Sequence, residues 1–302
     1  MLDGARLLLT FVQDCFQPSP PWRRMEGERR VGSGRPVVDN RAMTSPRSDP
    51  VAVAQALLEA RRNHVACDAV LVEPLLQSAA DAYTVQALVD RELTTGPAAL
   101  LARHWKSGGP SREAVLTHAP LPADGVVTSP ADLRARHFNG RLIEAEIALR
   151  LGRDVTPQQA ARLTPNEARG LVDAMAVSIE IVDSRWQQGA KAAPALLKLA
   201  DLQSHGALVL GEWRPFEARD WSAQACSVRI GNAPAVDSRG VHSLGDPAWL
   251  LPTWLRHATR DGASVPGGTV VTTGTWCGML PAAAGDRVTA CFEGIGEASV
   301  QL

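Results

Sequence analysis

Alternating apolar and polar residues fill the second half of the chain and predict β-strands. In a strand, successive side chains point to opposite faces, so an alternating segment has one face suited to burial. Seven segments follow this pattern: 142–149, 177–182, 207–210, 225–230, 269–273, 287–292 and 297–302. We therefore expect a β-rich region that begins near Gly140 and reaches the C-terminus.

Before this region the apolar residues follow helical spacing. One helix is predicted from Val51 and a second from about Ser78 to Leu93. We therefore expect residues 51–139 to form a small helical N-terminal module.

Three short helices are predicted between the strands. Thr156 and Thr164 each begin a capping box, in which the Thr hydroxyl and a Gln or Glu three residues later satisfy free backbone N–H groups. A third helix is expected to start at Asp246-Pro247, and Pro252 should shorten or kink it. These helices do not alternate strictly with strands, so the pattern favours a mixed α+β roll over a doubly wound sheet.

Residues 1–50 differ in composition from the rest of the chain. They are rich in Arg, Gly and Pro, and such a segment buries too little apolar surface to offset the entropy of ordering. We expect a flexible extension, with Met43 as a candidate physiological start. The expected organisation is therefore an extension at 1–50, the helical module at 51–139 and a β-rich catalytic domain at 140–302.

Overall charge and cysteine content narrow the class of function. The 302 residues carry a formal charge of −1, so no long-range field attracts nucleic acid or an anionic membrane, and a small-molecule ligand is expected. Five scattered cysteines without C-x-x-C spacing predict reduced thiols in the core of a cytoplasmic protein.

The candidate chemistry lies in three glutamates. Glu144 and Glu146 are two residues apart in an alternating segment, which places both carboxylates on one face of a strand, and Glu180 occupies a similar place in the next predicted strand. Two adjacent ionised carboxylates repel each other, so a partly dry site implies a shared proton or a bound cation. Three carboxylates suit Mg²⁺ or Mn²⁺, since hard cations take oxygen ligands. The spacing alone also fits solvated glutamates on an exposed face, and it leaves that choice open.

Other catalytic classes find less support. The seven histidines form no H-x-H or H-E-x-x-H pattern, which argues against zinc. There is also no G-x-S-x-G sequence, which argues against an acyl-enzyme mechanism.

Several segments together resemble one known family. They are Ile143-Glu-Ala-Glu-Ile, Ser178-Ile-Glu-Ile-Val-Asp-Ser-Arg-Trp, Lys198-Leu-Ala-Asp-Leu-Gln-Ser-His-Gly and Leu244-Gly-Asp-Pro-Ala. In this order they resemble the 2-oxopent-4-enoate hydratase and 4-oxalocrotonate decarboxylase branch of the fumarylacetoacetate hydrolase superfamily. The resemblance covers about residues 51–302 and implies a mixed β-roll of the fumarylacetoacetate hydrolase C-terminal type with a small helical N-terminal module.

The resemblance also implies a site and a reaction. Glu144, Glu146 and Glu180 would hold Mg²⁺ or Mn²⁺, which the 1-carboxylate and 2-oxo oxygens of a 2-oxo acid would chelate. Lys106 would help to move protons, with its pKa lowered by burial and the nearby cation, although its spacing alone also fits a solvated surface lysine. The expected reaction adds water to a 2-hydroxy-dienoate (2-oxoalkenoate) from aromatic ring-cleavage catabolism. The resemblance implies a homo-oligomer that can join a homologous decarboxylase.

Departures from the family pattern fall around the proton-handling residues. The family has Gly-Tyr-Lys-Ile-Gly where this chain has His104-Trp-Lys-Ser-Gly, and its Asp-Asn pair is Asp201-Leu202 here. An acidic residue expected near Thr128 is absent. Ser204 or His205 is the candidate to supply the missing polar contact.

These departures leave other activities open. A 2-oxo-enedioate decarboxylase or an acylpyruvate hydrolase would use the same metal site. A non-catalytic subunit that stabilises a catalytic homologue is an alternative from another class.

Overall fold

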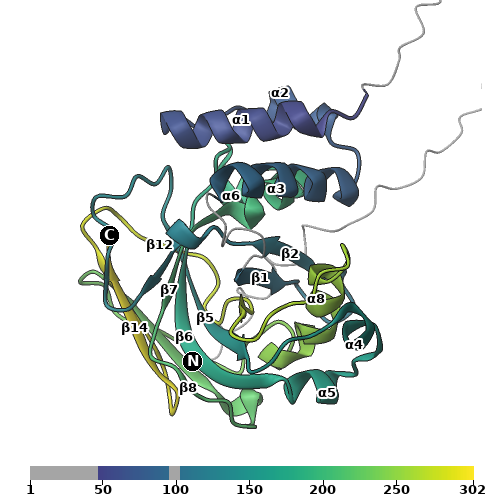
Figure 1. Cartoon of the computed structure of the whole chain (residues 1–302). Helices are drawn as coiled ribbons and strands as arrows, with labels where there is room; N and C mark the ends of the chain where they lie inside the picture. Colours follow the sequence, from purple (N-terminus) through teal and green to yellow (C-terminus); the bar gives the residue numbers. More distant parts are fainter. Residues whose placement is uncertain (1–46, 95–102) are drawn as a thin grey trace, which may run out of the picture. The chain divides into compact units, whose positions relative to one another are not determined.

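The alternating segments pair into two β-sheets in the computed structural model, which describes residues 47–94 and 103–302 (Figure 1). The larger sheet has the order β2-β1-β11-β5-β6-β7-β3, with β12 paired to β5 and β8 paired to β6. Its strands are β1 His104–Gly108, β2 Thr117–Pro120, β3 Val126–Thr128, β5 Leu142–Leu151, β6 Val172–Val182, β7 His205–Leu210, β8 Arg214–Pro215, β11 Val270–Thr272 and β12 Leu280–Pro281. The smaller sheet has the order β10-β9-β13-β14-β4. Its strands are β4 Ala131–Asp132, β9 Ala225–Ile230, β10 Val236–Arg239, β13 Arg287–Phe292 and β14 Gly296–Gln301.

The long strands β5 and β6 pair antiparallel and divide their side chains between two environments. Glu144 lies opposite Glu180 in the register, and Glu146 lies opposite Ser178. The alternate apolar residues of both strands are buried in the main core together with residues of β13 and β14. The alternation therefore buries apolar side chains on one face and gathers carboxylates on the other.

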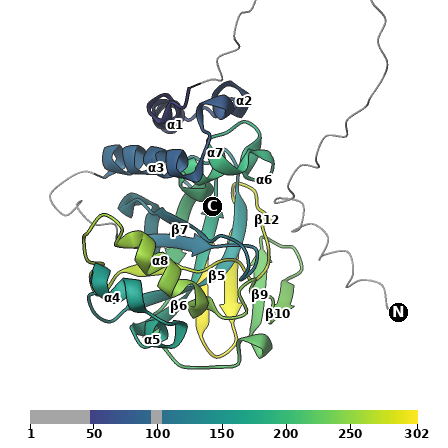
Figure 2. The same cartoon turned by 90° about the vertical axis from the view of Figure 1, so that its right-hand side faces the viewer.

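Helices occupy the loops and one side of the larger sheet. They are α1 Pro50–Asn63, α2 Ala69–Val72, η2 Glu73–Leu75, α3 Ala79–Leu93, η4 Ala123–Gly125, α4 Pro157–Arg162, α5 Pro165–Arg169, α6 Gly189–Ala192, α7 Ala195–Ala200, η5 Leu202–Ser204, η6 Trp221–Ala223, η7 Pro247–Leu250 and α8 Leu251–Ala258. A second core joins α1, α3 and α7 through apolar side chains such as Leu57, Val85 and Leu197. Figure 2 shows this helical layer beside the strands.

The sequence-based expectations for these elements are largely met. Each of the seven predicted strands overlaps an observed one, and both capping boxes form at Thr156 and Thr164. At Pro252 the structure explains the expected irregularity. The segment is a 3₁₀ turn up to Leu250, and Pro252 lies in the first turn of α8, where its missing N–H is not needed.

The structure differs from the sequence-based prediction between residues 104 and 132. Four short strands, β1 to β4, lie in this part, which was expected to belong to the helical module, and three of them join the larger sheet. Their shortness hid them, and β1 does not alternate as a one-sided strand of apolar residues would: Trp105 packs in the main core, whereas Lys106 contacts carboxylates. Of the extension predicted at 1–50, residues 1–46 lie outside the described residues. From Ser48 to Leu302 the chain clusters as one unit.

The structure bears on two further features, membrane-spanning helices and the location of the cysteines. Within the described residues, no helix is both long enough and apolar enough to cross a membrane. Four described cysteines are free thiols, of which Cys226 is buried and Cys291 is exposed, so the expected core location holds only in part.

Candidate functional site

Three carboxylates meet on one face of the larger sheet. Glu144 and Glu146 come from β5 and Glu180 from β6, and one ligand atom of each lies within 4.8 Å of the others. Glu146 and Glu180 are fully buried, and Glu144 is 9% exposed. Burial at this distance makes full ionisation of all three costly unless a positive charge lies among them.

Lys106 on β1 supplies such a charge. Its Nζ atom lies 3.0 Å from Glu144 Oε2 and 2.5 Å from Glu180 Oε2. The strand order makes this possible: β1 pairs with β11, which pairs with β5, so Lys106 lies level with Thr272 on the intervening strand. Lys106 is therefore not the solvated surface lysine that its spacing also allowed.

Neighbouring polar groups orient the third carboxylate, that of Glu146. The Thr272 hydroxyl donates a hydrogen bond to Glu146 Oε2, and the backbone N–H of Gly274 donates to the same oxygen at 3.0 Å. Ser178 Oγ lies 3.1 Å from Thr272 Oγ1 and fixes that hydroxyl in turn. Glu146 Oε1 has no hydrogen-bond partner among the described residues.

His205 contacts the cluster from β7. Its Nδ1 atom lies 3.3 Å from Glu180 Oε1, and its side chain is buried. Burial lowers the pKa of His205 below its ordinary value against the opposing effect of Glu180, so the ring is neutral at pH 7. Because Nδ1 faces a carboxylate, it carries the proton, which leaves Nε2 as a hydrogen-bond acceptor.

The pKa directions follow from burial and from the crowding of charges. Burial raises the pKa of Glu146 to about 7, and the charges of Glu180 and Glu144 add to this against the effect of Lys106. Burial also raises the pKa of Glu144. For Glu180, burial acts in the same direction, but Lys106 and His205 outweigh it and lower the pKa. Burial alone would lower the pKa of Lys106, but the carboxylates outweigh it and hold the pKa above its ordinary value.

The donor set fits a hard divalent cation. Carboxylate oxygens are the ligands that Mg²⁺, Mn²⁺ and Ca²⁺ prefer, and the unpartnered Oε1 of Glu146 is a buried acceptor that lacks a donor within the described residues. A bound cation would also relieve the repulsion that raises the pKa of Glu146. The three glutamates could therefore hold such an ion together.

Ser204 is the predicted site residue whose side chain has no hydrogen bond to this cluster among the described residues. Its Oγ is buried with no hydrogen-bond partner among the described residues, whereas its backbone N–H donates to Asp201 O. Asp201 itself has a structural contact, because it accepts hydrogen bonds from Arg185 and Arg61. The site residues predicted from the sequence did not include Thr272, which lies in the predicted strand 269–273, or Gly274, which follows that strand.

Comparison with known proteins agrees with this fold. The protein is a β-roll with a buried cluster of carboxylates. The sequence profile described as fumarylacetoacetate (FAA) hydrolase C-terminal matches residues 112–302. The chain belongs to this family, which confirms the resemblance and the fold class predicted from the sequence.

Named relatives are hydratases and decarboxylases. The chain is 34% identical over 170 residues to 2-keto-4-pentenoate hydratase 1 of Dechloromonas aromatica, a match that covers 53% of this chain and 61% of that protein. It is 31% identical to 2-hydroxyhexa-2,4-dienoate hydratase of Comamonas testosteroni, with 62% and 68% covered. The structure of 4-oxalocrotonate decarboxylase from Pseudomonas putida G7, complexed with magnesium and adipate, matches with a TM-score of 0.71 at 21% identity and covers 83% of this chain and 96% of that one. The last likeness concerns the fold.

Proposed function

We propose that this protein is a Mg²⁺- or Mn²⁺-dependent hydratase that adds water to a 2-hydroxy-dienoate (2-oxoalkenoate) from aromatic catabolism. The observation that carries this proposal is the cluster of Glu144, Glu146 and Glu180 around the Lys106 ammonium group. Similarity to two named hydratases over about half of this chain or more supports the reaction type.

In this proposal Glu144, Glu146 and Glu180 hold the metal. When bound, the ion acts as a Lewis acid toward the 1-carboxylate and 2-oxo oxygens of a 2-oxo acid. The Thr272 hydroxyl and the Gly274 N–H keep Glu146 in position, since both bind its Oε2 atom. Orientation of this kind fixes the ligands before the substrate arrives.

Lys106 moves a proton. Its Nζ atom contacts two of the three proposed metal-binding glutamates. It therefore lies beside the carboxylate and 2-oxo end of a substrate held there. A positive charge bound by the same carboxylates cancels the effect that raises the pKa of Lys106 and brings it toward the range useful for proton transfer. Lys106 then accepts the proton of the 2-hydroxyl group and returns one to carbon.

His205 is proposed to activate the water. Its Nδ1–H group donates to Glu180, which leaves Nε2 free to accept a proton from a water molecule. Net addition of that water across the distal double bond places the hydroxyl group on C4, the proton returned by Lys106 on C5 and the proton taken up by His205 on C3, which gives a 4-hydroxy-2-oxo acid. We assign no such step to Ser204, because its hydroxyl has no hydrogen-bond partner among the described residues.

Product analysis tests this proposal. Incubation of 2-hydroxypenta-2,4-dienoate with the protein and Mg²⁺ should bleach the dienoate ultraviolet absorbance and give 4-hydroxy-2-oxopentanoate by NMR, and EDTA should stop the reaction. No turnover of any 2-hydroxy-dienoate with Mg²⁺ or Mn²⁺ would refute it.

Decarboxylation is the second candidate. A 4-oxalocrotonate decarboxylase of a Pseudomonas species is 25% identical over 185 residues. Release of CO₂ from a 2-oxo-enedioate without hydration of a dienoate would favour this reaction. Cleavage of an acylpyruvate would instead indicate a hydrolase.

The assembly and cellular location complete the proposal. We expect a cytoplasmic homo-oligomer that is able to associate with a homologous decarboxylase. Light scattering of the protein alone and mixed with such a homologue measures both associations. Metal binding without turnover, together with activation of the added homologue, would support a non-catalytic partner subunit.

A further inference from the structure

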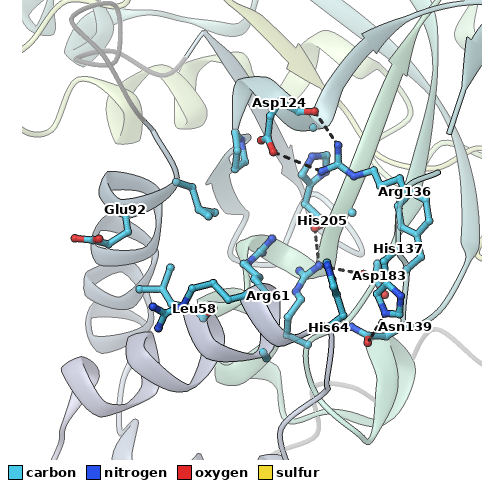
Figure 3. Close-up of a pocket in the computed structure, with 18 of the residues that line it drawn as sticks. Leu58, Arg61, His64, Glu92, Asp124, Arg136, His137, Asn139, Asp183 and His205 are labelled. Atoms are coloured by element: carbon cyan, nitrogen blue, oxygen red, sulfur yellow. Dashed lines mark hydrogen bonds and ion pairs between the residues drawn. The ribbon is translucent and has the colours of Figure 1, made fainter.

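A cavity of about 610 Å³ lies beside His205 and is also lined by the C-terminal ends of α1 and α3 and by residues 135–139 (Figure 3). None of the three glutamates lines this cavity, and neither does Lys106. Hydrogen bonds inside the protein position the glutamates instead. For Glu146, one of these hydrogen bonds leads to His242, a residue with no part in the proposed reaction.

The peptide group between Thr273 and Gly274 links His242 to Glu146. His242 Nε2 lies 2.9 Å from Thr273 O, and the N–H of the same peptide group, that of Gly274, donates to Glu146 Oε2 at 3.0 Å. This peptide is trans and planar, so its C=O and N–H groups point in opposite directions and turn together. A hydrogen bond that fixes the carbonyl therefore also fixes the direction of the N–H that binds Glu146.

The two ring nitrogens of His242 have defined roles. The backbone N–H of Leu244 donates to His242 Nδ1 at 3.3 Å, so Nε2 carries the proton of the neutral ring and donates to Thr273 O. The ring is buried, and burial lowers the pKa of His242 to about 4, so it is neutral at pH 7. The hydrogen bonds run in one direction from the Leu244 N–H to the Glu146 carboxylate, and each polarises the next.

The loop that carries His242 is itself attached to the connection that follows β1. Ser243 Oγ donates to Gly109 O at 2.8 Å, and Arg112 Nε donates to Leu244 O at 2.6 Å. These contacts need no metal. The ring of His242 is therefore held in place before a cation binds.

Gly274 suits the link to Glu146. Its φ angle of 107° lies in the region that L side chains rarely adopt, and a Cβ atom there would lie 3.7 Å from His242 Nε2. The segment continues along β5, because the N–H of Trp276 donates to Ala145 O at 2.8 Å, and the Trp276 ring packs against His242 with centroids 5.3 Å apart. The turn at Gly274 is thus fixed on both sides.

We infer that His242 is a positioning residue of the metal site, which sets the direction of the Gly274 N–H and through it the carboxylate of Glu146. The inference rests on the proposed function and adds to it a residue outside the glutamate cluster. The Gly274 N–H holds Oε2 of Glu146, whereas Oε1 has no hydrogen-bond partner among the described residues and is left for the cation. Without the His242 donor, the peptide is no longer held at its carbonyl, and Glu146 loses part of its orientation.

Two polar variants separate the hydrogen bond from the presence of a side chain. His242→Gln keeps an amide N–H at about the reach of Nε2, whereas the amide of His242→Asn is too short to reach Thr273 O. Calorimetric titration of the full-length, metal-free protein with Mn²⁺ should show that His242→Asn binds about threefold to tenfold more weakly, the usual range for one hydrogen bond. His242→Gln should bind close to wild type.

His118→Leu is the matched control. His118 is as deeply buried as His242 and has a hydrogen bond with Ser107, whose side chain points to the opposite face of β1 from that of Lys106. Its loss removes a buried histidine without touching the Thr273–Gly274 peptide. This variant should bind Mn²⁺ like wild type.

Amide hydrogen exchange at Gly274 measures the link without any metal. In the metal-free protein this amide should exchange slowly in wild type and in His242→Gln, and faster in His242→Asn. If His242→Asn does not fold, the wild type alone decides, because a Gly274 amide that exchanges as fast as an exposed one overturns the inference.

Failure of the inference differs from failure of the proposed function. If His242→Asn binds Mn²⁺ as tightly as wild type, or if Gln and Asn weaken binding equally, His242 does not act through its donor and the inference is refuted, while the proposed function stands. If the wild type binds no Mn²⁺, the proposed metal site fails and the inference falls with it.

Discussion

Glu146 shows a conflict between burial and charge in the carboxylate cluster. Burial and two neighbouring carboxylates raise its pKa to about 7, so above that pH its negative charge destabilises the metal-free protein. Glutamine keeps the shape of the side chain and removes the charge.

We therefore predict opposite effects of Glu146→Gln on function and on stability. Mg²⁺ affinity and metal-dependent activity should be lost, because one anionic ligand is gone. At pH 8 without metal, the free energy of unfolding should equal or exceed that of wild type, since the repulsion has been removed. Calorimetry and urea unfolding measure both, with the exposed Glu212→Gln as control. Unchanged Mg²⁺ affinity would contradict the proposed ligand.

A substitution at Lys106 tests proton transfer separately from metal binding. Lys106→Met should lower kcat by about 100- to 10,000-fold, the usual contribution of general acid–base catalysis, while Mg²⁺ still binds. Lys191→Met, at an exposed lysine, is the control. A mutant as active as wild type on a dienoate would exclude Lys106 from the mechanism and leave His205 as the remaining candidate.

The sequence could predict the residues of the cluster but not its surroundings. Alternation placed Glu144 and Glu146 on one face, because the period of a strand is a local property. The contact of Lys106 with Glu180 depends on the order of β1, β11, β5 and β6, which no local pattern encodes. The unpartnered Nε2 of His205 likewise depends on packing between distant segments.

At the scale of elements, the turn before β7 shows how a local conformation serves the site. Leu202, Gln203 and Ser204 all have positive φ angles, a conformation that costs a non-glycine residue about 1–2 kcal/mol. The family's Asn at the position of Leu202 would adopt it more easily. The turn leads directly into His205, whose Nδ1 atom lies 3.3 Å from Glu180 Oε1.

The end of α1 offers a test of the same conformational cost. His64 is exposed and caps α1 with φ 56°, a place where glycine is preferred. His64→Gly should raise the free energy of unfolding by about 0.5–1 kcal/mol, after allowing for the greater freedom of glycine in the unfolded chain. His64→Ala loses the same ring but keeps Cβ, so it should give no such gain. Equal unfolding free energies for the two variants would contradict this account.

At the scale of the whole molecule, buried histidines make the folded state sensitive to acid. His257 contacts the rings of Tyr83, His118 and Trp105, and burial lowers its pKa to about 3. The unfolded chain therefore binds a proton at His257 near pH 6.5, whereas the folded protein does not. Its contribution to stability is full above pH 6.5 and is lost as the pH falls.

We predict that His257→Phe reduces this acid sensitivity. The difference in unfolding free energy between the variant and wild type should shift in favour of the variant below pH 6.5, by at most about 1.4 kcal/mol per pH unit. Paired urea titrations between pH 7 and pH 4.5 cancel the contributions of other groups, including Glu146. A difference that does not change with pH would show that His257 is not buried as a neutral ring.

The central claim is that Glu144, Glu146 and Glu180 bind a divalent metal that takes up the 2-oxo acid. A crystal structure of the protein with Mn²⁺ and oxalate, which mimics the 1-carboxylate and 2-oxo oxygens, measures this directly. We predict an anomalous peak within bonding distance of all three carboxylates, with oxalate chelated and Lys106 Nζ moved out from between Glu144 and Glu180. Absence of a peak at the cluster, with Lys106 still bridging the two glutamates at saturating Mn²⁺, would contradict the account.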